Sequence, residues 1–124
     1  MFSFLSPQSI FFGRGQSAQT TALAKAYGPA VLVVHGSNAS RAQWLVTSCE
    51  KAGLATTTIT CEHEPSLPDI ERALDHLSGF RPDVVIALGG GSAIDFAKAL
   101  AALIPCEGDV GEYLEVVGNG RPLE

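Results

Sequence analysis

Short apolar stretches alternate along this chain with stretches whose apolar residues recur at helical spacing. Four of the short stretches are rich in β-branched or aromatic residues, and three of these four are followed directly by glycine. Such runs predict strands, and runs that are apolar throughout favour burial on both faces of a parallel sheet. The predicted strands cover residues 9–12, 30–35, 55–61 and 84–88.

Between these strands, apolar residues three to four positions apart predict helices. The predicted helices cover residues 16–27, residues from the 36–38 turn to about 52, about 68–77 and 92 to about 103, and a short helical turn covers 111–115. The inward face expected of the first helix is Ala18, Ala22, Leu23, Ala26 and Tyr27. The alternation of strands and helices predicts an α/β fold, with a parallel sheet and helices on both of its faces, in three layers. The length of 124 residues predicts a single domain.

The most informative stretch is a strand, a glycine turn and a helix, covering residues 84–98. Gly89, Gly90 and Gly91 remove every side chain from the turn, so it is able to adopt positive φ angles and to let another group approach the backbone. Ser92, with Asp95 three residues later, predicts a capping box at the start of the helix. A helix N-terminus with accessible amides suits a phosphate group.

Ligands of parallel sheets bind beyond the carboxyl ends of the strands. That edge is expected to collect three segments, residues 36–38, 62–66 and 89–92. A second glycine motif, Gly13-Arg14-Gly15, fits the first part of a dinucleotide fingerprint. The next strand ends without an acidic residue for a ribose hydroxyl, however, so a tight turn into the first helix is the favoured interpretation.

Charge and composition argue against several classes of binding partner. The net charge is −5 and the eight Lys and Arg residues do not cluster, so neither nucleic acid nor an anionic membrane surface is an expected partner. No apolar run approaches the ~18 residues that span a bilayer. The apolar N-terminus has no basic region or cleavage site of a signal peptide. The three cysteines are far apart and predict reduced thiols in a cytoplasmic protein.

The stretch Gly-Gly-Gly-Ser-Ala-Ile-Asp-Phe-Ala-Lys-Ala at residues 89–99 resembles a signature of the iron-containing (group III) alcohol dehydrogenase family. Residues 10–15, 33–41, 64–66 and 113–118 are similar to further segments of that family, in the same order. The resemblance covers essentially the whole chain. It implies a Rossmann-like N-terminal domain, residues 1–124, that binds NAD(H) or NADP(H).

The resemblance also implies the cofactor-binding residues. Gly90, Gly91 and Ser92 would contact the pyrophosphate, and Asp95 would lie near the cofactor or serve only in the capping box. Gly36, Ser37, Asn38 and Arg41 would border the ribose. Members that prefer NAD often have an acid where this chain has Gly36, and Arg41 could reach a 2′-phosphate. NADP(H) is therefore slightly favoured. Lys98 is expected to pair with Asp95.

The family's metal site, for iron or another divalent ion, belongs to a helical C-terminal domain that has no counterpart in these residues. His35, His63 and His76 lack the spacing of metal ligands, so neither a catalytic residue nor a metal ligand is predicted. The chain is expected to bind a dinucleotide weakly and not to turn over alone. It could be a truncated product, a cut piece or a subunit that needs a partner.

Two other functions stay open. One is a non-enzymatic nucleotide-binding module, and the other is a relative of dehydroquinate synthase, although residues 113–118 favour the dehydrogenase branch. Exposed apolar surface is expected to cause self-association. A homodimer would form through an edge strand within residues 2–12 or through the surface that a C-terminal half would cover.

Overall fold

Three parallel strands form the centre of the computed structural model, which describes residues 6–114, 118 and 120–123. The strands are β1 (Ala30–Gly36), β2 (Ala55–Cys61) and β3 (Val84–Leu88), in the order β2-β1-β3. Ala30 of β1 pairs with Ala55 of β2, and Val31 of β1 pairs with Val84 of β3. Their bounds agree with the predicted strands, apart from one added residue at the end of β1.

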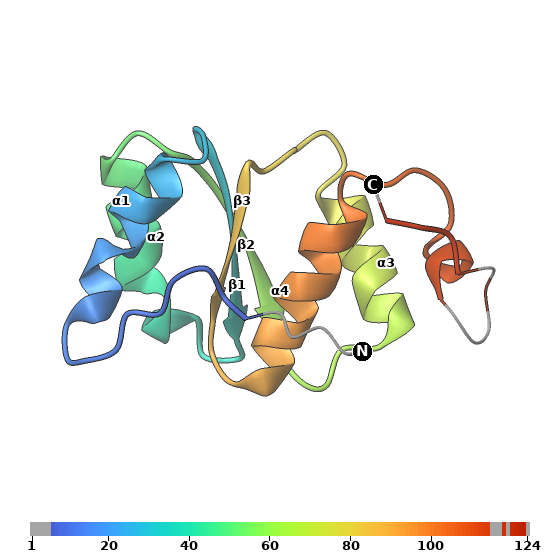
Figure 1. Ribbon diagram of the computed structural model, residues 1–124, viewed down its shortest axis with the longest axis horizontal. Coiled ribbons are helices and arrows are strands. Elements are labelled where there is room, and N and C mark those ends of the chain that lie inside the picture. The colour runs from blue at the N-terminus through green and yellow to red at the C-terminus, as the bar shows by residue number, and fades with distance from the viewer. Residues whose placement is uncertain (1–5, 115–117, 119, 124) are drawn as a thin grey trace.

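Helices cover both faces of this sheet, which confirms the predicted fold class. They are α1 (Thr20–Lys25), α2 (Gln43–Lys51), α3 (Leu67–His76) and α4 (Gly91–Leu103), with 3-10 turns η1 (Gln16–Gln19), η2 (Ala39–Arg41) and η3 (Val110–Tyr113). Figure 1 shows α1 and α2 on one side of the sheet and α3 and α4 on the other. The three layers therefore run from α1 and α2, through the sheet, to α3 and α4.

The middle strand β1 holds the two halves of the core together. Its four central residues, Val31 to Val34, are fully buried. Successive side chains of a strand point to opposite faces. Leu32 and Val34 accordingly pack in the cluster that contains Phe96 of α4, whereas Val31 and Val33 pack in the cluster that contains Leu45 of α2. An uninterrupted apolar strand thus serves two cores, as its sequence predicted.

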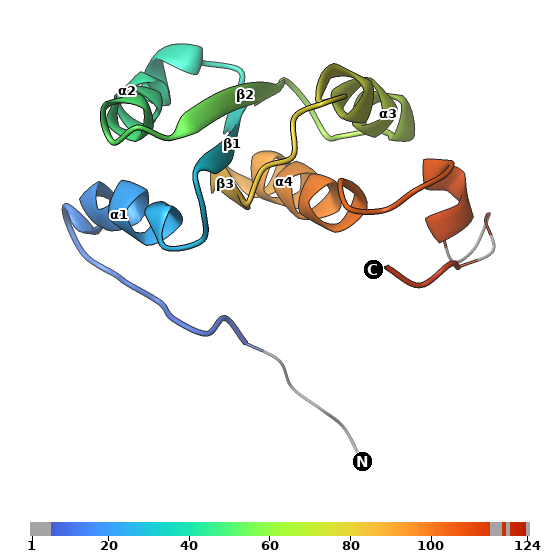
Figure 2. The same ribbon diagram turned by 90° about the horizontal axis from the view of Figure 1, so that it is seen from above.

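The predicted first strand is wrong for the described residues. Residues 9–12 adopt no strand, and Figure 2 shows this segment running away from the rest of the domain. Ile10 and Phe12 are 77% and 99% exposed. None of the three strands lies beside this segment to accept its backbone hydrogen bonds, and β propensity alone does not form a strand. The expected edge strand for a homodimer is therefore not seen in residues 6–12, and residues 2–5 lie outside the described residues.

The predicted first helix is shorter and less buried than expected. Residues 16–27 divide into η1 and α1, and the only buried residue of α1 is Ala24. Leu23 and Tyr27, on the predicted inward face, are 44% and 68% exposed. Part of the contact with α2 is polar, since the Thr21 hydroxyl donates to Ser48 Oγ at 2.8 Å. The spacing of apolar residues marked the helix correctly but not the face that it buries.

The strand order places a topological switch point beside β1. The chain leaves β1 through α2 on one face and reaches β2. It then crosses through α3 on the opposite face to β3, on the far side of β1. The segments that follow β1 and β3 therefore diverge to opposite faces. A crevice forms where such segments part, and ligands of open parallel sheets bind there.

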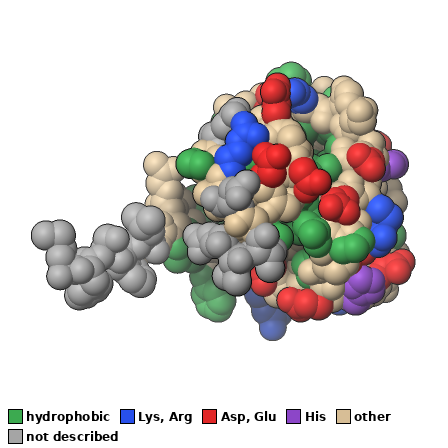
Figure 3. All heavy atoms as spheres, turned by 90° about the vertical axis from the view of Figure 1, so that its right-hand side faces the viewer, with side chains coloured by type: hydrophobic (Ala, Val, Ile, Leu, Met, Phe, Trp, Pro, Cys, Tyr) green, Lys and Arg blue, Asp and Glu red, His purple; other side chains and the backbone are tan. Residues whose placement is uncertain are grey.

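The described surface carries no sign of a basic interface on the side that faces the viewer in Figure 3. Acidic side chains are spread over this face between hydrophobic ones, and its blue Lys and Arg side chains do not gather into one patch. Among the described residues, no helix combines the length and the apolar character needed to cross a bilayer.

Candidate functional site

A cleft of about 720 Å³ lies at the switch point, between the carboxyl ends of β1 and β3. Residues that follow β1 form one wall and residues that follow β3 form the other. The lining residues are Ser17, His35, Gly36, Ser37, Asn38, Arg41, Ala42, Trp44, Leu88, Gly89 and Gly90. Five of the eight residues that the sequence predicted for a cofactor, Gly36, Ser37, Asn38, Arg41 and Gly90, are therefore brought together here.

The three glycines after β3 have different structural roles. A Cβ on Gly89 would meet Ala93 Cβ at 2.9 Å and the backbone nitrogen of Gly36 at 3.5 Å, so this glycine lets the two loops approach each other. A Cβ on Gly90 or Gly91 would meet nothing within 4 Å, and the same is true of Gly36. The fold leaves space beside these three residues, which suits a group that approaches the backbone closely.

The turn does not use the positive φ angles that its glycines would permit. None of Gly89, Gly90 and Gly91 adopts one, and Gly90 has an extended conformation with φ −84° and ψ −166°. Other residues can adopt such angles without strain. The value of glycine at positions 90 and 91 is therefore the open space above the backbone rather than an unusual backbone conformation.

The predicted capping box of Ser92 and Asp95 is wrong. Helix α4 begins at Gly91 with Gly90 as its N-cap, so Ser92 already lies inside the first turn and cannot serve as the cap. Its hydroxyl donates instead to Glu64 Oε2 at 3.2 Å. Asp95 pairs with Lys98 at 3.3 Å, as predicted for Lys98. Among the described residues no side chain caps α4 at Gly90, and its first-turn amides are left for another group.

Ser92, Asp95 and Gly91 are not among the residues that line the cleft. Gly91 follows directly on the lining residue Gly90, so it borders the cleft at the start of α4. Ser92 is half-buried beside Glu64, and Asp95 lies on an exposed part of the helix. Among the eight predicted residues, Asp95 is the one whose contacts least support a role in cofactor binding.

The loop after β1 is held by its own polar contacts. Asn38 Oδ1 accepts hydrogen bonds from the Ser40 backbone nitrogen at 3.1 Å and from Ser40 Oγ at 2.6 Å, which fixes the start of η2. Arg41 at the end of η2 is exposed, and its guanidinium makes no ion pair within the described residues. No carboxylate of the described residues lines the cleft. Its side-chain chemistry favours an anion.

Six of the lining residues were not among those predicted, and three of the six, His35, Trp44 and Ser17, carry polar or aromatic side chains. His35 is 5% exposed, and its Nδ1 lies 2.7 Å from the Gly36 carbonyl oxygen, which accepts the hydrogen bond. Trp44 is 42% exposed three positions after Arg41, out of phase with the buried face of α2. Its position off the buried face of α2 could have been predicted from the sequence and would have indicated an exposed tryptophan. Ser17 comes from the turn after Gly15, and no local pattern marks it.

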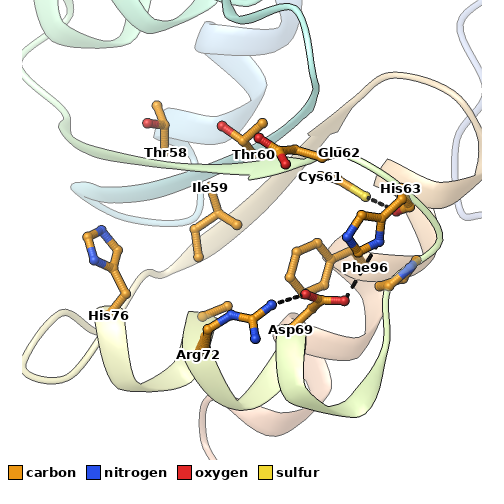
Figure 4. A pocket seen from close by; sticks show the side chains of 12 residues that line it. Thr58, Ile59, Thr60, Cys61, Glu62, His63, Asp69, Arg72, His76 and Phe96 are labelled. Atoms are coloured by element: carbon orange, nitrogen blue, oxygen red, sulfur yellow. Dashed lines mark hydrogen bonds and ion pairs between the residues drawn. The ribbon is translucent and has the colours of Figure 1, made fainter.

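A second hollow of about 340 Å³ lies beside β2 and α3, and Figure 4 shows it closely. Asp69 ion-pairs here with Arg72 and lies 3.8 Å from His63 Nδ1. Asp69 also accepts hydrogen bonds from the Ser66 hydroxyl at 2.5 Å and the Ser66 backbone nitrogen at 2.8 Å. These contacts, the Ser66 hydroxyl first, lower the pKa of the Asp69 carboxyl. Its charge is satisfied by the capping of α3, so we assign no ligand to this hollow.

Burial has the opposite effect on a neighbouring thiol. Desolvation raises the pKa of Cys61, whose Sγ donates to the His63 carbonyl oxygen at 3.1 Å. A thiol with a raised pKa is a poor nucleophile and a poor metal ligand. Across residues 6–114, 118 and 120–123, no three His, Cys, Asp or Glu side chains lie where they could hold a metal ion together. The described residues therefore do not fit an iron site.

A parallel sheet with helices on both faces, a glycine start to α4 and a cleft at the switch point are features typical of nucleotide-binding α/β domains. The family model for iron-containing alcohol dehydrogenases matches residues 7–124. The chain belongs to the iron-containing alcohol dehydrogenase family. This confirms the family that the glycine signature suggested.

Relatives in this family are longer than the chain. A probable NADH-dependent butanol dehydrogenase 2 of Bacillus subtilis (strain 168) is 32% identical over 113 residues, which are 87% of this chain and 29% of that protein. An NADPH-dependent butanol dehydrogenase of Clostridium saccharobutylicum is 32% identical over 81% of this chain and 26% of its own length. An iron-containing alcohol dehydrogenase from Thermotoga maritima has a crystal structure that is similar with a TM-score of 0.80, at 26% identity, over 93% of this chain and 34% of that one. The chain spans about a third of such relatives.

Proposed function

We propose that this chain is the dinucleotide-binding domain of an alcohol dehydrogenase that uses NAD(H) or NADP(H) together with a metal ion. The observation that carries the proposal is the start of α4. Gly90 is the N-cap there, no side chain of the described residues caps the helix, and open space lies beside Gly90 and Gly91. Amides at such a helix start bind phosphate groups. The nicotinamide of a bound cofactor would supply the hydride chemistry, and the residues of this chain would bind and orient the cofactor.

The start of α4 supplies only part of the binding energy. A helix N-terminus favours an anion by about 0.3 to 2 kcal/mol. Micromolar affinity requires about 8 kcal/mol. Most of the remainder would come from the adenosine half of the cofactor against the cleft wall of Gly36, Ser37, Asn38 and Arg41. Trp44, which is partly exposed on the same wall, would add apolar contact.

We assign no catalytic residue and no metal ligand to this chain. Because the described residues do not group three metal-binding side chains, a metal ion that polarises the alcohol would be held by residues outside this domain. The relatives are about three times as long as the chain, and this leaves room for such residues. The alcohol substrate would be chosen by the same outside residues. The match to iron-containing alcohol dehydrogenases supports this branch over that of dehydroquinate synthase.

The cleft supports NADP(H) as a cofactor at least as well as NAD(H). It contains no carboxylate that would repel a 2′-phosphate, and the exposed guanidinium of Arg41 lies in its wall. Arginine binds phosphate groups through paired N–H donors. The relatives do not decide the preference, because one of those described is NADH-dependent by name and another NADPH-dependent.

Isothermal titration calorimetry with NADH and with NADPH tests this proposal. We expect both cofactors to bind with micromolar to millimolar dissociation constants, and NADPH at least as tightly as NADH. Arg41→Ala should weaken NADPH about tenfold and NADH less, which corresponds to the loss of about 1.4 kcal/mol from one charged contact. Arg14→Ala is the control, since Arg14 is exposed but does not line the cleft. No binding of either cofactor at millimolar concentration would refute the function, and a strong preference for NADH would refute the preference alone.

A further inference from the structure

A carboxylate from another part of the fold lies at the start of α4. Glu64, in the loop between β2 and α3, accepts a hydrogen bond at Oε2 from Ser92 Oγ at 3.2 Å. Ser92 is the second residue of α4. The loop after β2 therefore reaches across the carboxyl edge of the sheet to the helix start at which we propose that a pyrophosphate binds. This inference rests on the proposed function.

The position of Glu64 beside the start of α4 has a clear electrostatic reason. Helix α4 has no acidic residue in its first turn and no side chain that caps it at Gly90. The amino end of a helix carries a partial positive charge, which stabilises a nearby anion. Glu64 supplies such an anion from outside the helix. Because Glu64 is exposed, its side chain has room to take another rotamer when the helix start is needed for a different anion.

We propose that Glu64 sets the dinucleotide affinity of this site by competing with the pyrophosphate for the start of α4. In the structure its carboxylate accepts a hydrogen bond from the Ser92 hydroxyl. A pyrophosphate on the amides of Gly90 and Gly91 would bring further negative charge close to that carboxylate, and like charges at short range repel. Binding therefore requires the Glu64 side chain to release Ser92 and turn away. Glu64 is an affinity-determining residue and takes no part in chemistry.

Titration of the chain and of its Glu64→Gln variant with NADH tests the proposal. Glutamine keeps the size of the side chain and removes its charge. We expect a dissociation constant about three- to tenfold lower in the variant, which is the effect of removing one like charge near an exposed site. ADP should show the same gain because it also carries a pyrophosphate. Adenosine, which has no phosphate, should show none, and the gain with NADH should shrink as the salt concentration rises.

Two further variants serve as controls for the effect of Glu64→Gln. Glu50→Gln changes the net charge by the same amount at the far end of α2, away from the carboxyl edge, and should leave the NADH affinity unchanged. Glu64→Ala removes the carboxylate without a polar replacement and should shift the affinity in the same direction as Glu64→Gln. Circular dichroism establishes that each variant is folded before it is titrated.

Three results would overturn the inference. Equal NADH affinity in the parent chain and in both Glu64 variants would show that the carboxylate does not compete. Weaker binding in the variants would show that Glu64 accepts hydrogen bonds from the ligand, for example from ribose hydroxyls. Binding of NADH by none of the proteins at millimolar concentration would refute the proposed function, and the inference would fall with it. The first two results leave the proposed function intact.

Discussion

Helices α3 and α4 cover the same face of the sheet and begin at the same edge, yet their first turns are built differently. Helix α3 is closed by its own residues. Ser66 and Asp69 form a capping box, and a proline lies in the first turn. Helix α4 begins with Gly90 and Gly91 and has no side-chain cap at Gly90. Each helix start leaves up to four backbone N–H groups without a partner in the helix. One start is completed within the fold, and the other is left for a partner from outside the helix.

The two helix starts at this edge of the sheet differ in purpose. The residues at the start of α3 stabilise the fold, whereas those at the start of α4 leave backbone amides accessible to a ligand. With glycine in place of Ser, Asn or Asp as its N-cap, α4 forgoes about a few tenths of a kcal/mol of stabilisation. Its glycine positions gain nothing in packing, because a Cβ on Gly90 or Gly91 would meet no atom within 4 Å. A residue choice that costs stability and brings no contact is typical of a binding site. The contrast can be tested by giving α4 a side-chain N-cap, as α3 has.

The largest effect is expected from Gly90→Asp. Its carboxylate would cap α4, so we expect unfolding by denaturant to require about a few tenths of a kcal/mol more free energy, because the glycine that it replaces is already a tolerated N-cap. The same carboxylate would occupy the amides that we assign to the pyrophosphate and would repel it. We expect the NADH affinity to fall about a hundredfold or more, equivalent to about 2.7 kcal/mol.

Opposite signs for stability and affinity are the distinctive result of this substitution. Gly90→Asn is the matched control, because asparagine caps a helix about as well as aspartate without its charge. It should stabilise the domain similarly and weaken NADH less. An NADH affinity that Gly90→Asp leaves unchanged would place the pyrophosphate elsewhere and remove the contrast between the two helix starts.

Much of this contrast was readable in the sequence, but not all of it. The run Gly-Gly-Gly-Ser before an apolar helix marked the open start of α4, because glycine after a buried strand has few structural explanations. The sequence did not reveal that α4 begins at Gly91. Helix bounds depend on which amide first finds a partner, and a shift of one residue removed Ser92 from the capping position. Ser66 and Asp69, with the spacing of a capping box, were overlooked.

Contacts between distant segments were the least predictable. The bond between Ser92 and Glu64 joins residues 28 positions apart and depends on the order of the strands. The failed prediction of a strand at residues 9–12 has the same origin. An apolar and aromatic sequence favours a strand, but a strand also needs a neighbour, and none lies beside this segment within the described residues. Its exposed Phe12 leaves self-association as a prediction.

A change in pH should alter the stability of α3 more than that of α4, because the capping box of α3 depends on the Asp69 carboxylate. The hydrogen bonds from Ser66 lower the folded-state pKa of Asp69 below its unfolded value. A lowered pKa means that the contribution of Asp69 to stability is present above the unfolded value of about 3.9 and is lost as the pH falls through the folded value. We expect Asp69→Asn to lower the melting temperature at pH 7 and to approach the parent chain as the pH falls through the folded-state pKa of Asp69.

Thermal unfolding of both proteins between pH 7 and pH 2.5 measures this convergence. Asp75→Asn removes an acid from the other end of the same helix, where no side-chain partner holds it within the described residues. It should keep the pH profile of the parent chain. A constant difference in melting temperature between Asp69→Asn and the parent chain at every pH would show that the charge of Asp69 does not stabilise the capping box.

The smallest effect is expected at Asp95, which the family resemblance placed near the cofactor. In the structure it pairs with Lys98 on the exposed side of α4, and the two side chains are 60% and 73% exposed. Exposed pairs of this kind contribute about 0.2 to 0.5 kcal/mol. We therefore expect Asp95→Ala to change the free energy of unfolding by no more than that, and to leave the NADH dissociation constant within about twofold.

A double-mutant cycle with Lys98→Ala isolates the pair from other effects of each substitution. A tenfold loss of NADH affinity in Asp95→Ala, but not in Lys98→Ala, would return Asp95 to the cofactor site. The binding surface of α4 would then extend past its first turn. If the affinity is unchanged in both variants, the functional part of α4 is confined to the residues from Gly90 to Ser92, where the helix starts without a cap and where Glu64 reaches it.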